Sequence, residues 1–119
     1  KVSFTPHLVP IPRGLFITLH LAGKTGATTA GLTRVFQDFY AEEPMVAVLP
    51  ESALPHTKAV LGSNRCHLSV RVDERTGQII VLSALDNLVK GAAGQAIQNM
   101  NLLFELPETT GLTALGIWP

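Results

Sequence analysis

The clearest helical pattern in the chain lies between residues 86 and 105. Apolar residues recur there at steps of three and four, at Val89, Ala93, Ala96, Met100 and Leu103. This spacing places them on one face of an α-helix. Asp86 precedes the pattern and is a favoured N-cap, because its carboxylate can accept the free amide hydrogens of a first helical turn. We therefore expect a helix from Leu88 to about Phe104, capped by Asp86.

The first turns of this expected helix contain two glycines, Gly91 and Gly94, on either side of Ala92 and Ala93. A glycine in a helix interior costs about 1 kcal/mol relative to alanine. A helix that keeps two of them usually lets something approach its backbone closely. The pattern leaves two candidates for that neighbour: another packing element of the protein, or a flat ligand.

Alternating apolar and polar residues predict three longer β-strands. In residues 15–22 the odd-numbered positions are all leucine or isoleucine, and residues 66–72 alternate in the same way. Residues 78–85 are apolar on both faces, which indicates a central strand covered on both sides. The loop that joins the last two strands ends at Gly77 and fits a hairpin with a bulge. Shorter strands are predicted at residues 1–5, 45–49 and 58–61.

A second amphipathic helix is predicted between Thr28 or Thr29, either of which can act as N-cap, and Pro44. Its apolar positions are Leu32, Val35, Phe36, Phe39 and Tyr40. Their spacing is that of one buried face, so we expect this aromatic stripe to lie in the core. Strands and helices in this order predict an α+β fold with a mixed, mostly antiparallel sheet and helices packed on it, in one domain.

Composition narrows the classes of function. Nine basic residues balance nine acidic ones, which gives no reason to expect capture of nucleic acid or of an anionic membrane. No apolar run reaches the roughly 18 residues of a membrane span. The apolar fraction is 46% and the charged fraction only 15%, so we expect apolar surface that is buried against a partner subunit or a missing domain.

The start of the chain and its one cysteine add two expectations. The sequence begins at Lys1, without an initiator methionine or a secretory signal, and we expect it to be a piece of something larger. An internal disulfide is excluded by the single Cys66, which is typical of a reducing cytosol or organelle. Strands at a cut edge expose unpaired backbone, so a solitary fragment is expected to self-associate.

The sequence contains no motif that by itself identifies a reaction. There is no glycine-rich dinucleotide loop, phosphate loop, zinc spacing or nucleophile elbow, and no metal site is expected. Cys66 and His67 are adjacent in an expected strand, so their side chains point to opposite faces. Arg13 follows a proline-rich connector and can offer its planar fork to a carboxylate or phosphate, with an ordinary ion pair as the equal alternative.

Four segments together resemble one enzyme family. They are VSFTPHLVPIPRG at residues 2–14, GSN at 62–64, DNLVKGAAGQAIQNMN at 86–101 and LPETTGL at 106–112. They closely resemble N-acetyl-γ-glutamyl-phosphate reductase, which uses NADPH to make N-acetylglutamate semialdehyde in arginine biosynthesis. The resemblance spans the whole chain. A relative acting on aspartyl phosphate is disfavoured by the LPETTGL tail.

The resemblance implies a Rossmann domain that binds NADP and a catalytic and dimerisation domain on a mixed sheet. Residues 1–119 would be the C-terminal part of the second, and residues 86–105 would return toward the nucleotide-binding domain. The NADP(H) contacts implied in this way are Asn87, Gly91, Ala92 and Gly94. Asn87 would be the partner of the nicotinamide carboxamide. Arg13, and second Asn64, are the expected contacts to the substrate N-acetyl-γ-glutamyl phosphate.

The family's catalytic residues have no match in this chain. Its mechanism needs a cysteine thiolate that attacks the acyl phosphate and a histidine that acts as acid and base. Cys66 does not fit the family's N-P-G-C-like loop, and His7 lies after the H-R-H-x-P-E-I-like stretch that holds the family histidine. We therefore expect both catalytic residues upstream of Lys1 and no activity from this chain alone.

Two hypotheses about function follow. In the first, the residues belong to the reductase, in a homo-oligomer (a dimer or tetramer) in the cytoplasm or in an organelle stroma. In the second, they form a non-enzymatic module for oligomerisation, or for assembly with a separately encoded nucleotide-binding half.

Overall fold

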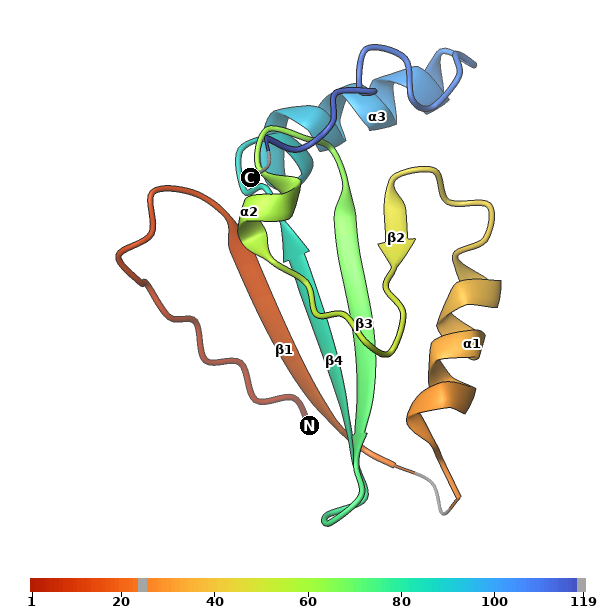
Figure 1. Cartoon of the computed structure of the whole chain (residues 1–119). Helices are drawn as coiled ribbons and strands as arrows, with labels where there is room; N and C mark the ends of the chain where they lie inside the picture. The colour runs from red at the N-terminus through yellow and green to blue at the C-terminus, as the bar shows by residue number, and fades with distance from the viewer. Residues whose placement is uncertain (24–25, 118–119) are drawn as a thin grey trace.

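The computed structural model describes residues 1–23 and 26–117 (Figure 1). Its helices and strands are β1 (Leu15–Ala22), α1 (Thr29–Phe39), β2 (Val46–Val48), α2 (Thr57–Val60), β3 (Cys66–Asp73), β4 (Gln78–Leu85), the π-helix η1 (Val89–Ala93) and α3 (Gly94–Leu103). In Figure 1, α2 and α3 lie at one end of the sheet and the β3–β4 turn lies at the other. The sequence ends in a tail, residues 108–119, which carries the single tryptophan, Trp118, and which we expect to dock onto the fold; Trp118 itself lies outside the described residues.

The four strands form one mixed sheet in the order β1-β4-β3-β2. β4 pairs antiparallel with both neighbours over its full length, so that Leu85 lies opposite Leu15 of β1 and Cys66 of β3. β2 is short and runs parallel to β3. This confirms the predicted α+β fold with a mixed, mostly antiparallel sheet and the central place of residues 78–85.

The helix α1 begins at the predicted cap, but its apolar stripe is only partly covered. Thr28 Oγ1 accepts a hydrogen bond from Gly31 N at 3.1 Å. Thr29 Oγ1 accepts one from Val72 N of β3 at 3.0 Å, which ties the start of the helix to the sheet. The prediction that the whole stripe lies in the core is wrong for Val35 and Phe39, which are 58% and 76% exposed. The described residues leave this face of α1 without a complete cover.

Two short predicted strands are absent from the described structure. Residues 1–5 form no strand, and residues 57–60 form the helical turn α2 where a strand was predicted at 58–61. A strand needs a neighbour that offers unpaired backbone groups. β4 is paired on both sides by β1 and β3, so it offers no free edge to either segment. The outer edge of β1 stays unpaired within the described residues.

The helix predicted for residues 86–105 is present, and its first turn is wider than an α-helix. The backbone N–H of Gly91 donates to Asp86 O at 2.9 Å, and that of Ala93 donates to Leu88 O at 3.1 Å. These bonds span five residues, which defines the π-helix η1, and such turns are frequent at functional sites. α3 then continues to Leu103.

The buried face of α3 differs from the predicted apolar stripe. Its buried residues are Gly94, Gln98 and Asn101, whereas Met100 and Leu103 of the stripe are exposed. The sequence pattern predicted an apolar face and left open what that face packs against. In this chain that face has no covering element among the described residues, and the polar face packs inward because it finds hydrogen-bond partners there.

The apolar core is small for a chain this rich in apolar residues. It consists of Met45, Val60, Val70, Val81, Ala84 and Leu112. Every residue of β1 is exposed. This agrees with the expectation of apolar surface in need of a cover. Among the residues described, no helix combines the length and apolar character needed to cross a membrane.

Candidate functional site

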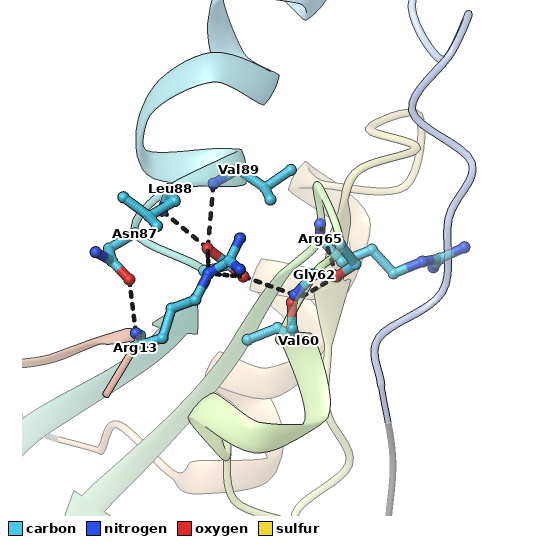
Figure 2. A network of polar contacts seen from close by, with 10 residues as sticks. Arg13, Val60, Gly62, Arg65, Asn87, Leu88 and Val89 are labelled. Carbon is cyan, nitrogen blue, oxygen red and sulfur yellow. Dashed lines mark hydrogen bonds and ion pairs between the residues drawn. The ribbon is translucent and has the colours of Figure 1, made fainter. Parts of the chain in front are cut away.

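The carboxylate of Asp86 is the junction of three segments at the α3 end of the sheet. It is fully buried. Its hydrogen-bond donors are Gly62 N at 2.6 Å, Leu88 N at 2.8 Å, Val89 N at 3.1 Å and Arg13 Nε at 3.0 Å. Figure 2 shows these donors converging from the arm, which is the segment of residues 1–14 before β1, and from the Gly62 turn and the start of η1. The predicted N-cap role is thereby confirmed, with two further segments attached to the same group.

The hydrogen bonds decide the charge state of Asp86. Burial by itself raises the pKa of this carboxyl, but the bonds from Gly62, Leu88, Arg13 and Val89 outweigh it, so the pKa lies below its usual value. Hydrogen bonds to a carboxylate favour its charged form. Asp86 is therefore ionised at neutral pH, and Arg13 carries the opposite charge.

Gly14 follows Arg13 in the arm, and it contacts Asn87, which follows Asp86 at the start of the helix. Gly14 N donates to Asn87 Oδ1 at 2.7 Å. Gly14 has a φ of +116°, and a Cβ at this position would lie 2.8 Å from the Thr57 Cβ of α2. Only glycine fits this backbone conformation in so narrow a space. The arm is thus held between α2 and the first turn of the helix.

Of the two expected substrate contacts, Arg13 forms the ion pair that was the alternative reading. Its Nε lies 3.0 Å from Asp86 Oδ2, and its side chain is 34% exposed. Asn64 is only 1% exposed, and its Nδ2 donates to Gln98 Oε1 at 2.8 Å. Both residues have partners inside the chain.

Asn64 also explains why a glycine is needed at position 94. A Cβ at Gly94 would overlap the Asn64 Oδ1 atom and approach the Val89 carbonyl oxygen at 2.8 Å. Asn64 Oδ1 is buried and accepts no hydrogen bond within the described residues. The close neighbour of Gly94 is therefore a side chain of this protein. At Gly91 the corresponding contact is looser, 3.3 Å from Leu85 Cδ1, and Gly91 itself is exposed.

A buried polar network behind the helix was not predicted. Gln98 Oε1 accepts hydrogen bonds from Asn64 and, at 2.7 Å, from Lys90 Nζ, while Gln98 Nε2 donates to Glu108 Oε1. Asn101 Nδ2 donates to the backbone oxygens of Glu108 and Thr110, at 3.0 and 2.9 Å. Burial lowers the pKa of Lys90, and the negative charges near it only partly offset this. The network fastens the tail to α3.

The tail continues from this network to α2. Leu112 is buried, and Ile117 N donates to Leu61 O at 2.8 Å. Pro107 ends the helical pattern, and the tail that follows it was expected to dock. The expected docking of the tail is confirmed as far as Ile117.

The outward face of η1 consists of small residues, and beside it lies a side-chain amide whose NH2 group has no hydrogen-bond partner among the described residues. Gly91, Ala92 and Ala93 are exposed. Asn87 is half-buried, and its Nδ2 has no hydrogen bond within the part of the chain that the structure describes. A flat ring bearing a carboxamide needs a smooth surface and a hydrogen-bond donor. The residues present therefore fit the nicotinamide end of NADP.

Two hollows lie at opposite ends of the sheet. One, of about 200 Å³, is mainly apolar and lies between η1, α3 and the tail, with Asn64, Val89 and Gly94 in its lining. The other, of about 900 Å³, lies between the start of α1 and the β3–β4 turn, and none of the predicted site residues lines it. Among the described residues, no three metal-ligating side chains come together in one group.

Sequence comparisons place the chain among known proteins. It is 58% identical to N-acetyl-gamma-glutamyl-phosphate reductase from Symbiobacterium thermophilum, over 97% of this chain and 33% of that protein. It is 52% identical to the protein of the same name from Moorella thermoacetica, over 100% of this chain and 34% of that protein. The resemblance seen in the sequence is confirmed, and the chain spans about a third of the length of these relatives.

A structural comparison adds the fold. The crystal structure of aspartate semialdehyde dehydrogenase II from Vibrio cholerae superposes with a TM-score of 0.64 and 21% sequence identity, over 82% of this chain and 29% of that one. Residues 1–87, which include β1 to β4, match the family described as semialdehyde dehydrogenase, dimerisation domain. The chain belongs to this family.

Proposed function

We propose that residues 1–119 are the C-terminal part of the catalytic and dimerisation domain of an N-acetyl-γ-glutamyl-phosphate reductase. The observation that carries the proposal is the identity of 52–58% to relatives of that name along essentially the whole chain. The complete enzyme would reduce N-acetyl-γ-glutamyl phosphate to N-acetylglutamate semialdehyde in arginine biosynthesis, in the cytoplasm or in an organelle stroma.

The reaction would need residues that lie in the uncovered two thirds of the relatives. These are the nucleophilic cysteine, the acid–base histidine and the nucleotide-binding loop. Bound NADPH would supply the hydride. Cys66 is half-buried with its Sγ 3.3 Å from Ser83 Oγ, and the exposed His7 contacts only its neighbour Thr5 O, at 3.1 Å. Neither position supports a catalytic role.

The helix of residues 86–105 would pack toward the nucleotide-binding domain. The family match ends at residue 87, so this helix lies beyond the dimerisation segment. Its outer face carries the exposed apolar side chains Ile97, Met100, Leu102, Leu103 and Phe104. An apolar face of this extent needs a cover in the complete protein, and the nucleotide-binding domain is the cover that we propose.

The cofactor would meet the first turn of this helix. Asn87 would offer its free Nδ2 to the carboxamide, and Gly91 and Ala92 would let the ring approach the exposed backbone. Gly94 is buried against Asn64, so its support of the cofactor would be through packing. Contact of Arg13 and Asn64 with the substrate stays a prediction, with the structure giving both residues internal partners.

The dimerisation segment would form the contact to a second subunit. Every residue of β1 is exposed, including Leu15, Leu19 and Leu21 on one face and Phe16 on the other. A homo-oligomer, dimer or tetramer, would cover this surface. The same exposed surfaces favour the second candidate function, a non-enzymatic assembly module derived from the enzyme.

An activity assay in the reverse direction separates the two functions. NADP reduction with N-acetylglutamate semialdehyde and phosphate is measured for this chain alone, for this chain mixed with a separately made upstream half, and for the full-length polypeptide. We expect activity in the mixture and the full-length protein and none in the chain alone. Silence in all three would support the assembly module and overturn the proposed reductase.

A further inference from the structure

Two successive residues of the arm hold two successive residues at the start of the helix. Arg13 pairs with Asp86, and Gly14 N donates to Asn87 Oδ1 (Figure 2). The two contacts are one peptide unit apart on both sides, so a change at Arg13 is transmitted to Gly14 and from there to Asn87.

The contact from Gly14 fixes which way the Asn87 amide faces. A backbone N–H can only donate, so the atom it meets at 2.7 Å must be the amide oxygen. The Nδ2 group then points away from the arm with both of its hydrogens free for another partner. Without the arm in place, the amide is free to rotate and loses this preference.

Arg13 is well suited to hold the arm without shaping the fold elsewhere. Arg13 contacts Asp86 through an ion pair, and its side chain is about one third exposed. Asp86 in contrast also caps η1 and holds the Gly62 turn. Changing Arg13 therefore loosens the arm but leaves the cap of the helix and the turn bonded.

We propose that Arg13 is a positioning residue for the cofactor: by pairing with Asp86 it seats Gly14, and Gly14 orients the Asn87 amide with its donor toward the carboxamide of a nicotinamide ring. The inference rests on the proposed function, in which Asn87 contacts the cofactor. It gives Arg13 a role on the cofactor side of the reaction, in place of a contact to the acyl phosphate.

A double-mutant cycle in the full-length reductase tests this role. The variants are Arg13→Gln, Asn87→Ala and the double variant. For each, the Kd of NADP is measured by equilibrium titration, the KM of the acyl substrate by steady-state kinetics, and the thermal midpoint by calorimetry. We expect R13Q to raise the Kd of NADP about threefold to tenfold and to leave the KM of the acyl substrate unchanged. In the N87A background R13Q should change the Kd by less than about twofold, because coupled residues are not additive.

Arg71→Gln is the matched control. Arg71 is also a partly buried arginine, and it donates to Glu51 O and Ala53 O at 2.8 and 2.7 Å, away from the arm. R71Q should lower the thermal midpoint without raising the Kd of NADP. Arg13→Lys keeps the charge beside Asp86 but loses the guanidinium geometry. It should fall between wild type and R13Q, and it replaces R13Q in the cycle if that variant does not fold.

Three results would overturn the inference, and they point to different errors. A raised KM of the acyl substrate with an unchanged Kd of NADP would make Arg13 a substrate contact. Additive effects of R13Q and N87A would mean that Arg13 acts independently of Asn87. An N87A variant with unchanged Kd would remove the cofactor contact itself, while activity of the wild-type protein in the reverse assay would still uphold the proposed reductase.

Discussion

Asp73 and Asp86 lie at the ends of the two strands of the same hairpin, at opposite ends of the sheet. Both accept hydrogen bonds from the turn that follows: Asp73 from Arg75 N and Thr76 Oγ1 at 3.0 and 2.7 Å, and Asp86 from the first turn of η1. In both, these bonds lower the pKa of the carboxyl.

The two aspartates differ in the number of separate chain segments that each one holds by hydrogen bonds. The bonds of Asp73 stay within its own exposed turn, which closes at Gly77 with a φ of +69°. Asp86 is fully buried and also holds Arg13 and Gly62, residues 73 and 24 positions away. A capping residue can be a local stop signal or the junction of distant segments, and burial distinguishes the two.

Replacing each aspartate by alanine should reveal the largest difference in unfolding free energy between the two ends of the sheet. Asp86→Ala leaves the Arg13 guanidinium, about one third exposed, and three backbone N–H groups without their acceptor, and should cost about 3 kcal/mol of unfolding free energy. Asp73→Ala should cost much less, because water reaches the groups that it leaves. Denaturant unfolding of both variants checks this. Equal losses would contradict the junction role of Asp86.

The two glycines of the helix start should also respond differently. Gly94→Ala places a methyl group against Asn64 Oδ1 and should cost about 1–3 kcal/mol of stability. Gly91→Val projects from the exposed turn and should weaken cofactor binding more than it weakens the fold. Thermal midpoints and NADP titrations of the full-length protein provide both readings. Equal losses of stability and affinity at Gly91 would indicate simple helix packing there.

A smaller change in stability is expected when the pH is lowered. Asp86 has a folded-state pKa below its ordinary value of 3.8, so the unfolded chain takes up its proton first as the pH falls. The stability contributed by Asp86 is therefore present above about pH 4 and is lost as the pH falls through the folded-state pKa. The difference in thermal midpoint between wild type and Asp86→Asn should shrink between pH 5 and pH 3, as an approximate range for a carboxyl group. A constant difference would contradict this charge state.

Local patterns were enough to predict the elements that depend on near neighbours. Spacing and capping chemistry predicted the strand at residues 15–22, the hairpin of β3 and β4, a cap at Thr28 or Thr29, and the Asp86 cap. Each involves contacts within a few residues or between adjacent strands. The family resemblance could also be seen in the sequence, because each of its motifs is a contiguous stretch of residues.

Contacts between distant segments were beyond these patterns. Residues 57–60 form the helical turn α2 in place of the strand predicted at 58–61, and β4, the strand that α2 contacts, is already paired on both sides. Gln98 and Asn101 face inward because Asn64 and the tail supply their partners. Phe39 and Leu103 remain exposed, because no element among the described residues covers them.

For the candidate site, the sequence suggested residues but not their pairings. It named Arg13, Asn64, Asn87 and Gly94 one by one. The structure joins Asn87 to Gly14 and Asn64 to Gly94, and it places Arg13 on Asp86. These pairings depend on the glycine conformation of Gly14 and on the turn at Gly62, which no periodicity reveals.

Hydrogen–deuterium exchange of the full-length protein, with and without NADP, tests most directly the claim that the first turn of the helix faces the cofactor. If the first turn of the helix faces the cofactor, NADP should slow amide exchange at residues 87–93 and leave the turn at residues 73–77 unchanged. Unchanged exchange at residues 87–93 under saturating NADP would contradict the account.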